Sequence, residues 1–299
     1  MNKFIVTTTI NEPTTATKKF AANPNWTLIV VGDKKTPHNA YEKLNCIYLH
    51  PDEQERRYKE LSDSLGWNTI QRRNMGFIYA HEMGADIVAT VDDDNIPYDD
   101  WGTDLYVGSE IEVDIWEAEN GYFDPLSVTN RNDLWHRGYP IELLRTKNNV
   151  EYKGKTKRKV LIQADLWDGD PDIDAMCRLT KKPIVKYDNH KPYGSMNQPS
   201  PFNSQNTFLA RTVIPHYMVL PFVGRMDDIW ISYMMHDLFP NSMVYNRPSV
   251  YQDRNKQDLV RNLENEIIGY RNTLPLTKQT YSLPQQTINC YNLYKQYFK

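Results

Sequence analysis

Three consecutive aspartates, Asp92, Asp93 and Asp94, follow an apolar run of the chain at 87–91. Like charges repel one another, so this cluster is costly unless solvent, an arginine or a metal ion compensates it. In an extended chain, residues i and i+2 point the same way, and Asp92 and Asp94 can therefore face one point. Two carboxylates suit Mn²⁺ or Mg²⁺, which keep open positions for phosphate oxygens. This DXD motif predicts a metal-assisted diphosphate site, with an exposed acidic turn or a helix cap as the alternative.

Four side chains upstream of this motif could contact a nucleotide. Arg72 and Arg73 could reach a diphosphate or a base, although adjacent arginines are more often surface charges. Asp33 follows a second apolar run, where it could accept a hydrogen bond from a ribose or a base, or only cap a turn. Thr8 is assigned to the same donor site, together with Asp93.

The segment LWDGDPDIDA at 166–175 carries a second acidic cluster, formed by Asp168, Asp170, Asp172 and Asp174. Carboxylates at this density could orient the hydroxyl groups of an acceptor. Helix capping alone explains two of them, because acids are favourable in the first turn of a helix. Calcium is a competing ligand, but the spacing of an EF-hand loop is absent from the sequence.

A third cluster lies in VGRMDDIW at 223–230, where Asp227 and Asp228 stand at an expected helix N-terminus after Arg225. A carboxylate at this place could act as the general base toward an acceptor hydroxyl. It could equally cap the helix and pair with Arg225. The pattern alone favours neither role.

Secondary-structure elements must position these clusters. In the first part of the chain, strand signals alternate with helix signals. Helical spacing of apolar residues predicts a helix at 68–85, and apolar or β-branched runs predict strands at 3–10, 26–33, 46–50 and 86–91. The last of these runs is apolar throughout its strand, as expected for a buried parallel strand. The pattern predicts an open, mostly parallel α/β sheet flanked by helices, in which ligands bind beyond the carboxyl ends of the strands.

The middle of the chain is less regular. Its basic run KGKTKRK at 153–159 is interpreted as a solvated loop, with a mobile phosphate-binding flap as the alternative. Strand and helix signals return at 184–187, 206–211, 227–239 and 257–270. We expect one unit over 1–299, with a nucleotide-binding half at 1–100, an acceptor-side half at 101–250 and a helical tail at 251–299.

The composition excludes several classes of protein. The 299 residues are 40% hydrophobic and carry a net charge of -3, so no nucleic-acid partner is expected. The three cysteines are far apart and form neither a disulfide framework nor a zinc motif. No segment has the apolar length of a signal-peptide core or a membrane span, and we expect a soluble, cytoplasmic protein.

Several segments together resemble the STELLO-type glycosyltransferase family, which was first catalogued as a domain of unknown function. More distantly, they resemble the plant reversibly glycosylated polypeptides, which act as UDP-arabinopyranose mutases. The matching segments occur in the family's order: VTTTINEPT, WTLIVVGDKKTP, RRNMGFIYAHEMGADIVATVDDDN, HRGYPIELL, LWDGDPDIDAMCRLT, FNSQNTFLAR and RMDDIW.

The resemblance implies a GT-A fold and a nucleotide-sugar donor, with UDP as the favoured nucleotide. Asp92 and Asp94 would hold Mn²⁺ or Mg²⁺ on the diphosphate. Asp33 would contact the uridine, and Arg72 or Arg73 would contact the base or the phosphates.

Further site residues also come from the resemblance. Arg137 matches the arginine that becomes glycosylated in the mutase branch, and we expect it to contact the substrate. Asp228, in the pattern R-x-D-D-x-W, is the expected general base. GT-A enzymes often add a late histidine as a metal ligand, whereas Gln252 stands at that position here. The third metal ligand therefore stays open.

The first hypothesis is a metal-dependent glycosyltransferase that moves a sugar from a UDP-sugar to an unknown carbohydrate or other hydroxyl acceptor. Asp228 or an acid of the second cluster, Asp170 foremost, would be catalytic. The acceptor side would be lined by Trp167, Asp168, Asp172 and Trp230. A UDP-sugar mutase centred on Arg137 is the second hypothesis, and a non-catalytic nucleotide-sugar-binding module is the third.

Overall fold

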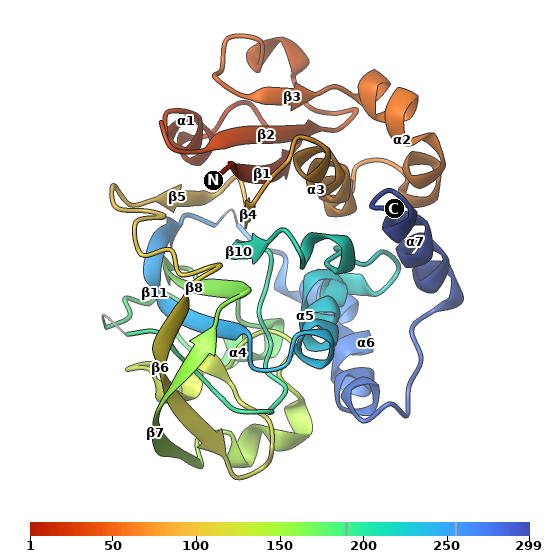
Figure 1. Cartoon of the computed structure of the whole chain (residues 1–299). Coiled ribbons are helices and arrows are strands. Elements are labelled where there is room, and N and C mark those ends of the chain that lie inside the picture. Colours follow the sequence, from red (N-terminus) through yellow and green to blue (C-terminus); the bar gives the residue numbers. More distant parts are fainter. Residues whose placement is uncertain (189–190, 255) are drawn as a thin grey trace.

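The computed structural model describes residues 1–188, 191–254 and 256–299. In this described part, one mixed sheet of eleven strands is flanked by helices (Figure 1). The strands are β1 (Lys3–Thr9), β2 (Thr27–Gly32), β3 (Ile47–Leu49), β4 (Ile87–Val91), β5 (Asn95–Pro97), β6 (Glu110–Ala118), β7 (Val150–Lys159), β8 (Ile162–Gly169), β9 (Tyr193–Gly194), β10 (Asn206–Ala210) and β11 (Met243–Gln252). The α-helices are α1 (Thr15–Ala21), α2 (Pro51–Leu65), α3 (Arg73–Glu82), α4 (Ala175–Thr180), α5 (Asp227–Leu238), α6 (Leu259–Thr277) and α7 (Gln285–Gln296).

The N-terminal part of the sheet is parallel and has the strand order β3-β2-β1-β4. Every residue of β4 is buried, as its almost entirely apolar sequence predicts for a strand covered on both faces. Helix α3 packs closely on β1 and β2, because a Cβ at Gly76 would come within 2.5 Å of Val6. The predicted α/β class, an open sheet flanked by helices, is confirmed.

The rest of the sheet is mixed. Strand β10 runs antiparallel between β4 and β8, and β11 runs parallel to β8. Strands β9, β6 and β7 extend the sheet beyond β11. Strand β5 pairs with the end of β11 (Figure 1). Parallel pairing therefore dominates only the N-terminal part. The segment after β4 and the ends of β8 and β11 nevertheless meet, because β5 joins β11.

The basic run at 153–159 is a strand, so its interpretation as a loop is wrong. It forms most of β7, which pairs antiparallel with β6 and places Lys155 opposite Asp114 and Lys157 opposite Glu112. Opposite charges across a strand pair are stabilising. Lysines on the outermost strand also discourage pairing with further strands.

The other predicted elements differ from the structure mainly at their ends. The helix expected at 68–85 is a 3-10 turn at Ile70–Arg72 that continues into α3, and the one expected at 257–270 belongs to the longer α6. The strand expected at 184–187 is not formed, and Val185 makes only an isolated bridge to Gly169. Helix α2 has no counterpart among the predicted elements, and α7 falls within the predicted helical tail at 251–299 without having been located there.

The C-terminal helices pack on the rest of the molecule. Helix α6 lies against the turn before α5, and α7 lies against α2 (Figure 1). Tyr294 of α7 donates a hydrogen bond from Oη to the Ile214 carbonyl at 2.9 Å. Residues of α7 thereby join the one core cluster that also contains the N-terminal strands. Within the described ranges, no helix combines the length and apolarity needed to cross a membrane.

Candidate functional site

A cavity of about 270 Å³, here called the strand-end cavity, opens at the carboxyl ends of β1, β2 and β4. The turn at 9–11 and the segment at 68–70 form part of its wall. Its lining includes six residues assigned from the sequence to the donor or the metal: Thr8, Asp33, Arg73, Asp92, Asp93 and Asp94. The parallel strand order therefore brings together side chains that lie far apart in the sequence.

The three aspartates after β4 have different partners. Asp92 Oδ1 accepts a hydrogen bond from Arg73 Nη2 at 2.5 Å, and Asp94 Oδ1 accepts one from Gln252 Nε2 at 3.3 Å. Asp93 instead accepts hydrogen bonds from Thr9, at the end of β1, and from Asn11 in the turn that follows. The carboxylates of Asp92 and Asp94 thus lie at the same cavity and are held by different side chains.

Partial burial makes the ionised forms of Asp92 and Asp94 unfavourable. Desolvation, followed by the charge of Asp92, raises the pKa of Asp94 to about 7. Desolvation also raises the pKa of Asp92, although Arg73 partly offsets the effect. A divalent cation would compensate both charges at once and remove this cost.

The oxygen atoms around Asp94 fit such a cation. Gln252 Oε1 is buried and accepts no hydrogen bond from any residue in the described part of the chain. No three Asp, Glu, His or Cys side chains gather into a metal site within residues 1–188, 191–254 and 256–299. Mg²⁺ is commonly bound by one or two carboxylates, with substrate phosphates and water completing its shell. Asp92, Asp94 and Gln252 could therefore hold Mn²⁺ or Mg²⁺.

Asp33 is buried at the wall of the strand-end cavity. Its Oδ1 accepts a hydrogen bond from the Lys34 backbone N–H at 2.6 Å, and its Oδ2 accepts one from the Thr69 backbone N–H at 3.2 Å. The carboxylate thereby fixes the segment at 68–70. Each carboxylate oxygen can accept a further bond, so Asp33 can also receive a ligand N–H or O–H.

Arg72 and Arg73 are adjacent in sequence but have different surroundings. Arg73 lines the strand-end cavity, whereas Arg72 is buried outside its lining. The Arg72 guanidinium donates to Gln54 Oε1 at 2.6 Å and lies 3.6 Å from the centre of the Trp67 ring. The structure therefore brings Arg73, and not Arg72, to the predicted donor site.

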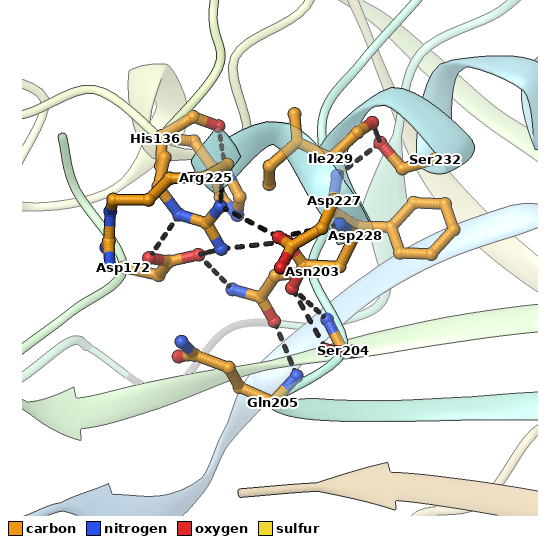
Figure 2. A network of polar contacts seen from close by, with 12 residues as sticks. His136, Asp172, Asn203, Ser204, Gln205, Arg225, Asp227, Asp228, Ile229 and Ser232 are labelled. Carbon is orange, nitrogen blue, oxygen red and sulfur yellow. Dashed lines mark hydrogen bonds and ion pairs between the residues drawn. The ribbon is translucent and has the colours of Figure 1, made fainter. Parts of the chain in front are cut away.

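A chain of polar contacts leads from Arg73 into the interior. Arg73 Nη1 donates to Ser204 Oγ at 2.8 Å, and Ser204 Oγ donates to Asp228 Oδ2 at 3.0 Å. The Ser204 backbone N–H donates to the same oxygen of Asp228 at 2.9 Å (Figure 2). Ser204 thus connects the metal motif with the third acidic cluster.

Arg137 continues this network toward the second acidic cluster. Its Nη2 donates to Asp228 Oδ1 at 2.9 Å, and its Nε and Nη2 donate to the two oxygens of Asp172 at 2.8 Å each. Asn203 Nδ2 also donates to Asp172, at 3.0 Å (Figure 2). Arg137, Asp172 and Asp228 are all buried, so this network is part of the interior.

Asp228 is poorly placed for the general base role predicted from the sequence. It is buried, and both of its oxygens accept hydrogen bonds from Arg137 or Ser204. Burial raises its pKa, but Arg137 outweighs this effect and the pKa lies below its ordinary value. Burial and the charge of Asp228 raise the pKa of Asp227 to about 7, so Asp227 is the more basic of the two.

The four aspartates of the second cluster do not converge on one point. Asp170 is partly exposed and pairs with Arg178. The other three are buried with separate partners, which are the Tyr98 hydroxyl for Asp168, Arg137 for Asp172 and the first turn of α4 for Asp174. Asp170 is therefore the most exposed member of this cluster, although it does not line the strand-end cavity.

The two tryptophans assigned to the acceptor side do not form an open aromatic surface. Trp230 is fully buried and donates from Nε1 to Thr273 Oγ1 of α6 at 3.0 Å. Trp167 is buried beside His136, with ring centres 5.7 Å apart. Neither tryptophan lines the strand-end cavity.

Arg225 lies in the turn before α5 and does not line the strand-end cavity. Its Nε donates to Glu266 Oε1 at 2.8 Å, and its carbonyl accepts a hydrogen bond from Arg137. Glu266 of α6 also accepts the Ala175 backbone N–H at 2.7 Å. Helix α6 thus helps to position the second and third clusters, a role that the sequence did not indicate for Glu266.

Two further residues of the site were not assigned from the sequence. Ser204 lies in the segment FNSQNT, which carries the family resemblance but gave no chemical reason to single out the serine. Arg254 follows β11 by two residues and lies 3.8 Å from Asp170, measured between Nε and Oδ1. Only the folded chain brings that arginine next to the acidic clusters.

Comparison with solved structures finds glucosyl-3-phosphoglycerate synthase from Mycobacterium tuberculosis. Its complex with Mg²⁺ and UDP matches over 94% of this chain and 80% of that chain, with 12% sequence identity and a TM-score of 0.47. Its complex with Mn²⁺, UDP and phosphoglyceric acid matches over 95% and 80%, with 13% identity and a TM-score of 0.45.

No family model matches the chain. Among curated proteins, it is 25% identical over 260 residues to "Probable glycosyltransferase STELLO2" and 24% identical over 259 residues to "Probable glycosyltransferase STELLO1", both from Arabidopsis thaliana. Each match covers 79% of this chain and 32% of the plant protein, so the chain spans about a third of the length of these relatives. The resemblance stated from the sequence is confirmed, and the chain is a relative of the STELLO-type proteins.

Proposed function

We propose that this chain is a metal-dependent glycosyltransferase of the GT-A type. It moves a sugar from a nucleotide sugar, with a UDP-sugar favoured, to a hydroxyl acceptor. The observation that carries the proposal is the meeting of Asp33, Asp92 and Asp94 at one strand-end cavity. The names of the two plant relatives support the same class of activity.

Asp92, Asp94 and the amide oxygen of Gln252 would hold Mn²⁺ or Mg²⁺. When bound, the metal supplies Lewis-acid compensation of the charge that develops on the leaving diphosphate. Arg73 fixes Asp92 through Nη2 and is itself fixed by Ser204 through Nη1. A preorganised arrangement of this kind avoids reorganisation during the reaction, which makes its electrostatic contribution large.

Asp33 and the segment at 68–70 would bind the nucleoside at the same cavity. The carboxylate can accept a hydrogen bond from a ribose hydroxyl or from a ring N–H of the base. In nucleosides, a ring N–H is present in uridine and guanosine but not in cytidine or adenosine. This chemistry is compatible with the favoured UDP-sugar donor.

We assign the proton-accepting role to Asp170 and a positioning role to Asp228. The Asp170 backbone N–H donates to the Gln252 carbonyl at 3.2 Å, so Asp170 is adjacent to the proposed metal site. Its side chain keeps 19% exposure, whereas Asp228 is enclosed by donors. A general base must reach the proton that it removes, and this requirement favours Asp170.

The mutase hypothesis loses support at its central residue. Arg137 is buried, and its three guanidinium nitrogens donate to Asp172, Asp228 and the Arg225 carbonyl. A sugar could attach to one of these nitrogens only after the network opened. The contacts of Arg137 therefore favour a positioning role.

The test begins with a thermal-shift screen of nucleotide sugars with and without Mn²⁺, since a bound donor raises the melting temperature. The donor that stabilises the protein is then incubated with Mn²⁺ or EDTA, and free nucleotide is measured together with the ring form of the sugar. We expect metal-dependent nucleotide release. Release that EDTA leaves unchanged would contradict the metal assignment. Ring interconversion without release would instead support a mutase, and binding without turnover would identify a binding module.

A further inference from the structure

The side chain of Arg254 is buried but poorly bonded. Only 8% of it is exposed, and within the described part of the chain neither Nε nor Nη2 has a hydrogen-bond acceptor. A buried guanidinium with free N–H groups is costly, because water does not replace the missing partners. Buried donors without partners call for an explanation, and a ligand that supplies the acceptors is one.

Carboxylates surround this guanidinium without accepting from those nitrogens. Asp170 Oδ1 lies 3.8 Å from Arg254 Nε, which is beyond hydrogen-bond distance, and Asp170 is already paired with Arg178. Asp172 and Asp94 interact with Arg254 through their charges. The surrounding carboxylates thus stabilise the charge of the Arg254 guanidinium but leave its Nε and Nη2 donors without acceptors.

The neighbouring arginines offer less capacity for a ligand. Arg137 and Arg178 each donate from all three guanidinium nitrogens to carboxylates or backbone carbonyls. Arg73 donates from both terminal nitrogens and keeps only Nε free. Among the described arginines next to the acidic clusters, Arg254 therefore has the largest number of unused donors.

The backbone places Arg254 next to the metal motif. Gln252 Nε2 contacts Asp94 Oδ1 at 3.3 Å, and the Asp253 backbone N–H donates to the Asp94 carbonyl at 3.0 Å. These two contacts hold the segment after β11 against the DXD turn, directly before Arg254.

We infer that Arg254 binds the diphosphate of the donor through Nε and Nη2. This inference rests on the proposed function, because it requires a nucleoside diphosphate at the strand-end cavity. Two adjacent N–H groups of a guanidinium match two phosphate oxygens, and such a charge-assisted contact is among the stronger hydrogen-bonding arrangements. The same contact stabilises the charge on the departing nucleoside diphosphate.

The experiment measures binding of UDP, inorganic pyrophosphate and uridine to the full chain by calorimetry in the presence of Mg²⁺. We expect R254M to weaken UDP and pyrophosphate about tenfold or more while uridine binding stays unchanged. R254K should keep part of the affinity, because lysine keeps the charge but loses the two-point geometry. R261M removes an exposed arginine of α6 and is the matched control, for which we expect no change.

Each other outcome has a defined meaning. If wild-type protein binds UDP with Mg²⁺ and R254M binds it equally well, the inference is overturned while the proposed function stands. A lower melting temperature of R254M with unchanged UDP affinity would show that Arg254 is only a structural partner of Asp170. Parallel loss of uridine binding would show a distorted cavity and also overturn the inference. If wild-type protein binds neither UDP nor pyrophosphate, the proposed function fails and Arg254 has no diphosphate to bind.

Discussion

The strand-end cavity and the network around Arg137 both contain buried aspartates, but they satisfy them differently. In the network, Arg137 outweighs the effect of burial and holds the pKa of Asp172 well below its ordinary range. At the cavity, burial and a neighbouring carboxylate raise the pKa of Asp94 to about 7. Asp172, which is enclosed and compensated by an arginine, belongs to the scaffold. Asp94 accepts a hydrogen bond from the neutral Gln252 amide and lies at the cavity, and a carboxylate in this situation favours a bound cation.

Removing the arginine of the network should have the largest effect on stability. R137M leaves Asp172 and Asp228 buried without their cation, and breaking a buried pair in this way costs roughly 3–5 kcal/mol. The free energy of unfolding, measured in urea, should fall by that amount. R145M removes an exposed arginine and should change it by less than about 0.5 kcal/mol.

R137M also shows whether Arg137 stabilises the fold or takes part in the reaction. If R137M unfolds at the wild-type urea concentration but loses all turnover, Arg137 acts in the reaction and the assignment to the scaffold is wrong. That result would also revive the mutase hypothesis, in which this arginine carries the sugar.

Removing a carboxylate from the strand-end cavity should act in the opposite direction on stability. D94N keeps the shape of the side chain but removes a charge that burial and Asp92 disfavour. We expect a higher melting temperature without metal at pH 8, together with a loss of about 100-fold or more in Mn²⁺-dependent UDP binding. D99N, at an exposed aspartate of the following loop, should change neither property. A D94N protein that binds UDP and Mn²⁺ normally would refute the metal assignment.

The strand-end cavity could be located from sequence because its signals are local. The apolar sequence of β4 indicates a buried strand, and Asp92 and Asp94 follow it directly. Asp33 has the same relation to β2. In a parallel sheet, strands that end together bring the following residues to one edge, so an alternating strand and helix pattern is sufficient to place them.

The network around Arg137 could not be derived in this way. Its members come from separate loops and from α5. Their pairing depends on the positions of antiparallel β10 and of α6, and no sequence pattern in either element indicates these positions. Trp230 illustrates the difficulty, because an aromatic residue near an acidic cluster fits an acceptor surface as well as a core. The structure places it in the core against α6.

The basic run at 153–159 was misread for a different reason. Its lysines alternate with Gly154, Thr156 and Arg158, which is a strand period, but an edge strand without an apolar face resembles a loop in composition. The acidic partner strand β6, which lies far away in the sequence, compensates the lysines. Composition alone therefore could not reveal the hairpin.

Asp165 of β8 sharpens the comparison, because it is a buried carboxylate whose hydrogen bonds come from neutral groups. Its oxygens accept from Gln163 Nε2 at 2.7 Å and from Ser249 Oγ at 2.6 Å, and burial raises its pKa to about 7. A raised folded pKa means that the stabilising contribution is complete below the unfolded pKa and is lost as the pH rises through about 7.

The variant D165N stays neutral at every pH and should not show this loss. Its free energy of unfolding relative to wild type should improve by roughly 1–3 kcal/mol between pH 5 and pH 8. Urea titrations of both proteins at several pH values measure this difference. If the difference in unfolding free energy is constant with pH, Asp165 is ionised in the folded protein without cost. Compensation by an arginine would then not explain why the pKa values of Asp172 and Asp94 differ.

Ser204 joins the two regions, and its hydroxyl should have the smallest effect. S204A removes the Oγ that accepts from Arg73 and donates to Asp228, but the Ser204 backbone carbonyl and N–H keep bonds to the same two residues. We expect a loss of about 1 kcal/mol in stability and a two- to fivefold weaker binding of UDP with Mn²⁺, since Arg73 supports Asp92 less firmly. S204T restores a hydroxyl and should recover most of both. If S204A lowers stability but leaves UDP affinity at the wild-type value, the network supports the fold without orienting the metal motif, and the two regions act independently.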